Sequence, residues 1–296
     1  MLGRLFGSSK KTPEDKKSDF VIEEDEVERQ DSAFIKSLRL HMSRMIAYAE
    51  SADTVLQREV AEKLANEAVK GEQQVQIVEL GGLKLLIPLT RSMDPEVQRL
   101  AAHALANLSV NADNQQLMAA DGAIDALVVL LESDQLQTQR QSAKALANLG
   151  VNYNNKRSIA EAGGIPKLIR LTAADINTTV KIEAIAALAN LAVNDQNEVD
   201  IEQQDGLRPI IATLIKTLST TESFTGPKDR DYSNSEELLA QCARALRNLS
   251  VNAANKQALV ALGAVPPLTR LLKHPNDRIA QQTKKALQNL GVPERK

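Results

Sequence analysis

The sequence predicts an all-α fold, a solenoid of stacked helical repeats with a capping helix at its N-terminal end. A phrase of the type Ala-Leu-x-Asn-Leu recurs along the chain, and its central asparagines are Asn66, Asn107, Asn148, Asn190, Asn248 and Asn289. Their successive spacings are 41, 41, 42, 58 and 41 residues. Such a period is typical of stacked helical units that pack only on their neighbours. Apolar residues make up 43% of the chain but aromatic residues only 2%, so we expect thin aliphatic layers rather than one aromatic core.

The composition also excludes several classes of protein. A net charge of −2 argues against bulk electrostatic binding to nucleic acid. No run of about 18 apolar residues offers a membrane span, so we do not expect membrane association. The single cysteine excludes an internal disulfide framework and is consistent with a reducing compartment. We therefore expect a cytoplasmic protein.

Residues 1–30 are expected to form a disordered, charged tail, because they are polar and poor in periodic apolar residues. The start, residues 1–11, leaves open an organellar or membrane-surface location, since Met1 to Phe6 could begin an interfacial helix or a presequence. The acidic run from Glu23 to Glu28 arrives too soon for a convincing presequence.

Residues 31–52 are predicted to form the capping helix. Asp31 and Ser32 are suitable N-cap residues. Apolar residues then recur at helical spacing, at Phe34, Leu38, Met42, Met45 and Ala49. This helix has no counterpart in the repeats. We therefore expect it to cover the first exposed hydrophobic face, as the terminal unit of a solenoid must.

Residues 53–293 are predicted to form the solenoid, with an N-terminal partial repeat followed by five full repeats. Each full repeat divides into a short first helix closed by glycine, an apolar second helix and a long third helix that contains the repeated phrase. In the second full unit these helices are expected at 114–121, 124–131 and 135–149. The interval of 58 residues places an insertion at about 219–235, between the second and third helices of the fourth unit. This insertion could carry regulatory phosphorylation or be a tolerated loop.

The three-helix period, the Gly-Gly-Ile-Pro junction at 163–166 and the repeated Ala-Leu-x-Asn-Leu phrase resemble the armadillo-repeat family over about 53–293. The resemblance implies a right-handed superhelix of the importin-α and β-catenin type, whose third helices line a concave groove. In such relatives the groove asparagines bind the backbone of an extended partner peptide. Asn66, Asn107, Asn148, Asn190, Asn248 and Asn289 are therefore predicted partner-binding residues.

This role has a physical basis, because an asparagine amide both donates and accepts and could pair with a peptide main chain of any sequence. The alternative is that these asparagines end helices and satisfy local carbonyl groups. A second set is expected to cap or terminate helices instead, namely Asn111, Asn152, Asn194 and Asn252.

Positions one and two helical turns before the asparagines are expected to set specificity. They supply six predicted groove residues, Arg99, His103, Arg140, Lys144, Arg244 and Lys285. Five of these are basic, which favours an acidic, extended partner segment, although Glu59, Glu62 and Glu183 interrupt the charge. The alternative is a solvated face of mixed charge. The tryptophans that importin-α relatives carry one turn before the asparagines are absent, so a basic nuclear-localisation peptide is not expected to bind.

No catalytic residue, metal site or cofactor is predicted. His41, His103 and His274 lie on unrelated elements, and Cys242 aligns with small core residues. We expect a non-enzymatic scaffold or adaptor that binds a protein partner and is monomeric when free. The alternative is a fixed structural subunit of a cytoskeletal, motor or organellar assembly.

The tail itself contains a candidate ligand for the predicted groove. Residues 20–26, Phe-Val-Ile-Glu-Glu-Asp-Glu, are apolar and then acidic, as the basic groove should prefer. Because the tether is short, even weak docking would compete with a partner, so the tail is expected to inhibit binding. The alternative is a solvated run of charge.

Overall fold

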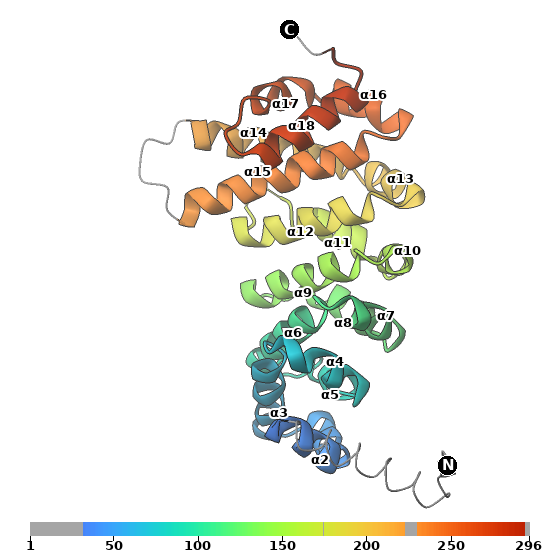
Figure 1. The fold of residues 1–296 in the computed structure, drawn as a ribbon, viewed down its shortest axis with the longest axis vertical. Coiled ribbons are helices and arrows are strands. Elements are labelled where there is room, and N and C mark those ends of the chain that lie inside the picture. Colours follow the sequence, from blue (N-terminus) through green and yellow to red (C-terminus); the bar gives the residue numbers. More distant parts are fainter. Residues whose placement is uncertain (1–31, 174, 223–229, 294–296) are drawn as a thin grey trace, which may run out of the picture.

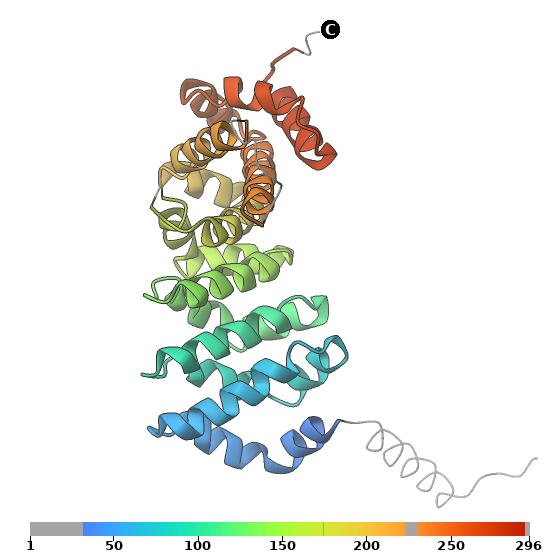
Figure 2. The ribbon, with the colours of Figure 1, turned by 90° about the vertical axis from the view of Figure 1, so that its left-hand side faces the viewer.

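The computed structural model describes residues 32–173, 175–222 and 230–293, and every regular element in these ranges is helical. The helices form successive layers, from α2 at the bottom of Figure 1 to α16, α17 and α18 at the top, and Figure 2 shows the same layering from the side. The predicted all-α solenoid is confirmed. The N-terminal tail, including residues 20–26, lies outside the described residues, so its expected disorder and self-inhibition stay predictions.

The first helix of the described chain, α2 (Ala33–Glu50), lies at the N-terminal end of the stack. Ser32 is its N-cap, because its hydroxyl accepts the backbone N–H of Ile35 at 3.2 Å. The apolar face packs against α3 (Thr54–Glu67) and α5 (Leu83–Leu89). Ile35 and Leu38 are fully buried, whereas Phe34 is only partly buried. The position suits the capping role, which stays a prediction.

Five units of three helices follow α3, which is the helix of the N-terminal partial repeat. Their first helices are η1 (Gly71–Gln73) with α4 (Gln74–Glu79), then α7 (Ala112–Ala120), α10 (Tyr153–Glu161), α13 (Asp195–Gln203) and α16 (Ala253–Ala261). Their second helices are α5, α8 (Ala123–Leu130), α11 (Gly164–Arg170), α14 (Leu207–Glu222) and α17 (Val265–Leu271). Their third helices are α6 (Pro95–Leu108), α9 (Leu136–Leu149), α12 (Thr178–Leu191), α15 (Arg230–Leu249) and α18 (Asp277–Asn289). From α3 to α18, each third helix packs directly on the next.

Asparagine caps start four of the first helices. The side-chain oxygens of Asn111, Asn152, Asn194 and Asn252 each accept the backbone N–H two residues further on, at 2.8 to 3.2 Å. The predicted capping role of these four residues is therefore confirmed. Because the cap comes first, α7 begins two residues before the predicted start at 114.

Two adjacent backbone positions make the turn between first and second helices. In the third unit Gly163 has φ of +80°, which a residue without a Cβ adopts at little cost. Gly164 follows, and a Cβ there would come within 2.7 Å of the carbonyl oxygen of Ile159 and 2.8 Å of its Cγ2. The second glycine is therefore required by close packing, not by its dihedral angles.

Much of the insertion in the fourth unit is helical. α14 continues to Glu222 and α15 begins at Arg230, so only residues 223–229 lie outside the described chain here. The lengthened helices are tied to the last unit by ion pairs of Arg270 with Glu222 and of Arg278 with Glu237. The insertion thus extends two helices where the sequence suggested a loop.

A further set of asparagines connects the first helices of successive units, a role that the sequence did not predict. The side-chain Nδ2 of each donates to a main-chain carbonyl in the preceding first helix, at 2.9 to 3.1 Å. All four are buried. We call them the buried ladder: Asn114, Asn155, Asn197 and Asn255. Since buried polar groups must be paired, these amides fix how neighbouring units meet.

Candidate functional site

The predicted partner-binding asparagines lie near the C-terminal ends of the third helices, one in each layer. We call Asn107, Asn148, Asn190, Asn248 and Asn289 the groove ladder. Asn66 occupies the corresponding position on α3 and is exposed. Because the third helices stack in register, the groove ladder runs along the length of the solenoid.

Amides of the groove ladder are already used between layers. Nδ2 donates to a carbonyl of the preceding third helix from Asn148 (3.4 Å), Asn190 (2.7 Å), Asn248 (2.6 Å) and Asn289 (3.1 Å). The alternative left open by the sequence was that these asparagines satisfy local carbonyl groups, whereas the acceptors here lie in the preceding layer. Asn107 differs, because its Nδ2 lies 3.2 Å from Nε2 of His103.

Part of the hydrogen-bonding capacity of the ladder remains for a ligand. An asparagine amide has two N–H donors and an oxygen with two lone pairs. Asn148 and Asn289 use both donors, the second on a serine hydroxyl at 3.1 Å, which leaves the oxygen. In Asn190 and Asn248 the oxygen accepts from Arg244 and Arg247, which leaves one donor each. The ladder therefore offers a ligand hydrogen-bond acceptors at Asn148 and Asn289 and donors at Asn190 and Asn248.

Two of the predicted cationic residues, Arg244 and Arg99, are already engaged by other groups of the protein. Arg244 turns into the layer interface, where it donates to the oxygen of Asn190 at 3.0 Å and to the carbonyl of Ala186 at 3.1 Å. Burial of the Arg244 guanidinium lowers its pKa. Arg99 donates two hydrogen bonds to Glu96, at 2.6 and 2.7 Å, and these lower the pKa of that carboxyl. Arg244 is therefore a packing residue, and the charge of Arg99 is largely offset.

The middle of the groove carries both signs of charge. Arg140 lies 3.8 Å from Glu183, but burial still raises the pKa of that carboxyl. Burial, with Arg99 and Lys144 nearby, lowers the pKa of His103. Within the described chain no ion pair engages Lys144 or Lys285, and Lys285 is exposed. These two lysines are the predicted cations best placed to meet a ligand.

A pocket of about 540 Å³ opens between the ends of α12, α15 and α18. It brings together three predicted residues, Asn248, Lys285 and Asn289. Arg247 also lines this groove pocket and was missed by the sequence analysis. The available signal was a departure from the repeat, because alanine precedes the ladder asparagine in the units of Asn107, Asn148 and Asn190. Ala192, Val193, Asp195, Glu198, Val251 and Gln288 complete the lining.

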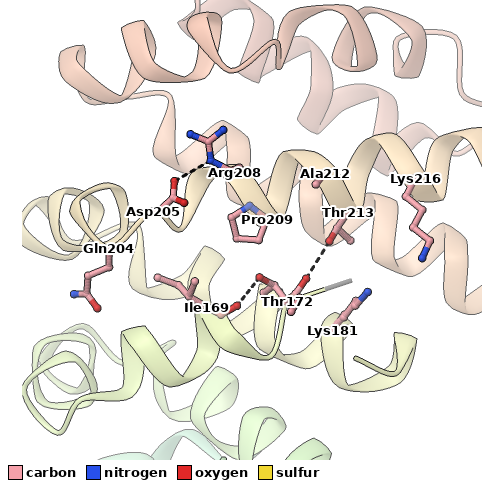
Figure 3. A pocket seen from close by; sticks show the side chains of 11 residues that line it. Ile169, Thr172, Lys181, Gln204, Asp205, Arg208, Pro209, Ala212, Thr213 and Lys216 are labelled. Carbon is pink, nitrogen blue, oxygen red and sulfur yellow. Dashed lines mark hydrogen bonds and ion pairs between the residues drawn. The ribbon is translucent and has the colours of Figure 1, made fainter. Parts of the chain in front are cut away.

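A second cavity, of about 510 Å³, lies away from the ladder between α11 and α14 (Figure 3). Thr213 donates to the carbonyl of Thr172 across it at 3.3 Å. Lys181 and Lys216 approach each other at one end, and burial and Lys216 together lower the pKa of Lys181. None of the predicted groove residues lines this cavity.

Within the described ranges, no cluster of three or more His, Cys, Asp or Glu side chains could hold a metal ion. The same part of the chain contains no helix that is long and apolar enough to cross a membrane.

Cys242 is expected to be unreactive in the folded protein. It is fully buried on α15, and burial raises the pKa of its thiol to about 12. Since the thiolate is the reactive form, a chromogenic disulfide reagent should react only when the chain unfolds. The chain has one cysteine, so the released chromophore reports on this site alone. Rapid reaction in native buffer, at a rate independent of urea, would contradict this assignment.

The chain belongs to the armadillo-repeat family. The model of the armadillo/beta-catenin-like repeat matches residues 72–110, 111–151, 152–193 and 252–292, which together exceed half of the chain. Residues 194–251, between the third and fourth matches, contain the unit with the insertion. No curated protein matches the chain.

Solved structures of engineered and designed proteins share the fold. One engineered protein has a TM-score of 0.71 and 29% identity, over 84% of this chain and 95% of its own. A designed armadillo repeat protein has a TM-score of 0.71 and 26% identity, over 83% of this chain and 98% of its own. Another, solved in complex with the peptide (KR)4, has a TM-score of 0.70 and 27% identity, over 83% and 98% of the two chains.

Proposed function

We propose that this protein is a non-enzymatic scaffold that binds an extended acidic segment of another protein along its groove ladder. The observation that carries the proposal is the groove pocket, where Asn248 and Asn289 lie beside the cations Arg247 and Lys285. Amides can pair with a main chain of any sequence, while the cations select for charge.

The charge of the ligand follows from which groove residues are already paired. Arg99 and Arg140 form ion pairs with carboxylates, whereas Lys144 and Lys285 form none among the described residues, although the charge of Lys144 also interacts with Glu183. Asp195 and Glu198 also line the pocket and place two carboxyl groups beside the cations, and burial raises the pKa of Glu198. An acidic segment would therefore find two lysines outside the described ion pairs, of which Lys285 is exposed.

The designed relative in complex with (KR)4 supports peptide binding by this architecture. The sign of the charge is expected to differ here, because (KR)4 is basic and the cations Lys144 and Lys285 would repel it. Partner exchange by a free, monomeric cytoplasmic protein is the form of this function that we propose.

The test is charge reversal at the two unpaired lysines. A labelled glutamate octapeptide should bind the wild-type protein, and Lys144→Glu with Lys285→Glu should weaken binding by about tenfold or more, since attraction becomes repulsion. Fluorescence anisotropy at low and high salt measures both the affinity and its screening.

The matched control carries the same change in net charge away from the groove, Lys84→Glu with Lys273→Glu, both exposed. It should bind like the wild type. Equal losses in the two variants would mean that overall charge and not the groove decides binding. A basic octapeptide that binds the wild type more tightly than the acidic one would overturn the proposed ligand.

A further inference from the structure

A row of exposed valines runs beside the groove ladder. Val110, Val151, Val193 and Val251 follow the ladder asparagines by three residues and are 59%, 63%, 55% and 64% exposed. In every case the valine N–H donates to the carbonyl of its own ladder asparagine, at 3.1 to 3.4 Å. The four valines therefore have the same local backbone geometry and occupy the same place in four successive layers.

The fold does not account for this repetition. More than half of each side chain lies outside the core, so packing does not require an aliphatic residue there. The preceding residue varies between serine, glycine and alanine, and the residue two positions on is Ala112, Tyr153, Asp195 or Ala253. Single exposed apolar residues are ordinary, whereas an exposed valine at the same position in four successive layers favours an interaction surface.

The valine row and the lysines lie on opposite sides of the ladder. Lys144 and Lys285 precede their ladder asparagines by four residues, one turn toward the start of the helix, whereas the valines follow by three. The groove pocket joins the two sides, since Val193 and Val251 line it together with Lys285 and two ladder asparagines. A ligand lying over the ladder thus has Lys144 and Lys285 on one side and the valine row on the other.

We infer that the ligand of this groove is an extended segment in which acidic and aliphatic residues alternate. Successive side chains of an extended strand point in opposite directions, and its main-chain groups point at right angles to them. With the main chain over the ladder, alternate side chains face the lysines and the valines. This inference rests on the proposed function and specifies its ligand.

The experiment compares two octapeptides of identical composition, one alternating glutamate and valine and one with all the glutamates first. The alternating peptide should bind about tenfold more tightly, because only in this peptide can all the glutamates face the lysines while all the valines face the valine row. Replacing the four valines by threonine, which keeps their shape, should remove this advantage, so that the alternating and block peptides bind equally well. Circular dichroism checks that the variant stays folded.

The control replaces Val129 and Val260 by threonine, since both are at least half exposed and lie outside the row. It should keep the full preference for the alternating peptide. Equal binding of the two peptides to the wild type, or a preference that survives loss of the valine row, would overturn the inference. If Lys144→Glu with Lys285→Glu still weakens the binding of both peptides, the proposed function stands without the inference. If charge reversal has no effect, or neither peptide binds, both proposals are wrong.

Discussion

Replacing Asn155 by alanine is expected to lower the free energy of unfolding by about 2–4 kcal/mol. Its side chain is buried on α10 and donates to the carbonyls of Gln115 and Leu149, at 3.0 and 3.2 Å. Truncation removes both hydrogen bonds and leaves a cavity where two units meet. Urea unfolding followed by circular dichroism measures the loss.

The control lies three residues earlier in the same helix. Asn152 is the partly buried N-cap of α10, so Asn152→Ala should cost only about 1 kcal/mol. Asn155→Leu separates hydrogen bonding from burial, because leucine fills space but cannot donate to the preceding unit. We expect it to be destabilising as well. A leucine variant as stable as the wild type would mean that the buried ladder acts only through packing.

Gly164→Ala is expected to cost about 1–3 kcal/mol, because its Cβ would overlap Ile159. Two other units of the chain have alanine at the position that corresponds to Gly164. Ala123 and Ala264 occupy the corresponding position in other units, and there the residue five positions earlier is Met118 or Leu259. Neither of these has the branched Cγ2 that a Cβ would meet at Gly164. Thermal or urea denaturation of the purified variant measures the cost.

The double variant Gly164→Ala with Ile159→Leu should therefore recover much of the lost stability. Ile159→Leu alone should cost less than about 1.5 kcal/mol, since the swap conserves volume. The double-mutant cycle yields a favourable coupling energy if the Cγ2 contact is the cause. Additive effects of the two changes would instead place the strain in the backbone contact with the carbonyl oxygen of Ile159.

The repeat period predicted the fold because each unit is short and repeats the same helix signals. Helix caps could be read in the same way, since Asn111 or Ser32 acts on backbone groups within its own turn. Residues that act between units could not. Asn155 was indistinguishable from a surface asparagine, because its acceptor lies 40 residues earlier in the chain.

The candidate site illustrates the same limit. Helical spacing placed Arg244 and Lys285 on one face, but it gave no direction for long, flexible side chains. Arg244 finds acceptors in the preceding layer, whereas Lys285 stays at the surface. The helical extensions on either side of 223–229 could not be predicted for a related reason, since a polar composition suits an exposed loop and a solvated helix equally well.

Both asparagine ladders share one direction. Asn155 and Asn197 donate to the first helix of the unit before, and Asn190 and Asn248 donate to the third helix of the unit before. During synthesis the N-terminal units emerge first. Each new unit therefore brings its amide donors to a folded surface whose carbonyl acceptors are already in position, and the growing chain serves as its own template from the ribosome outward.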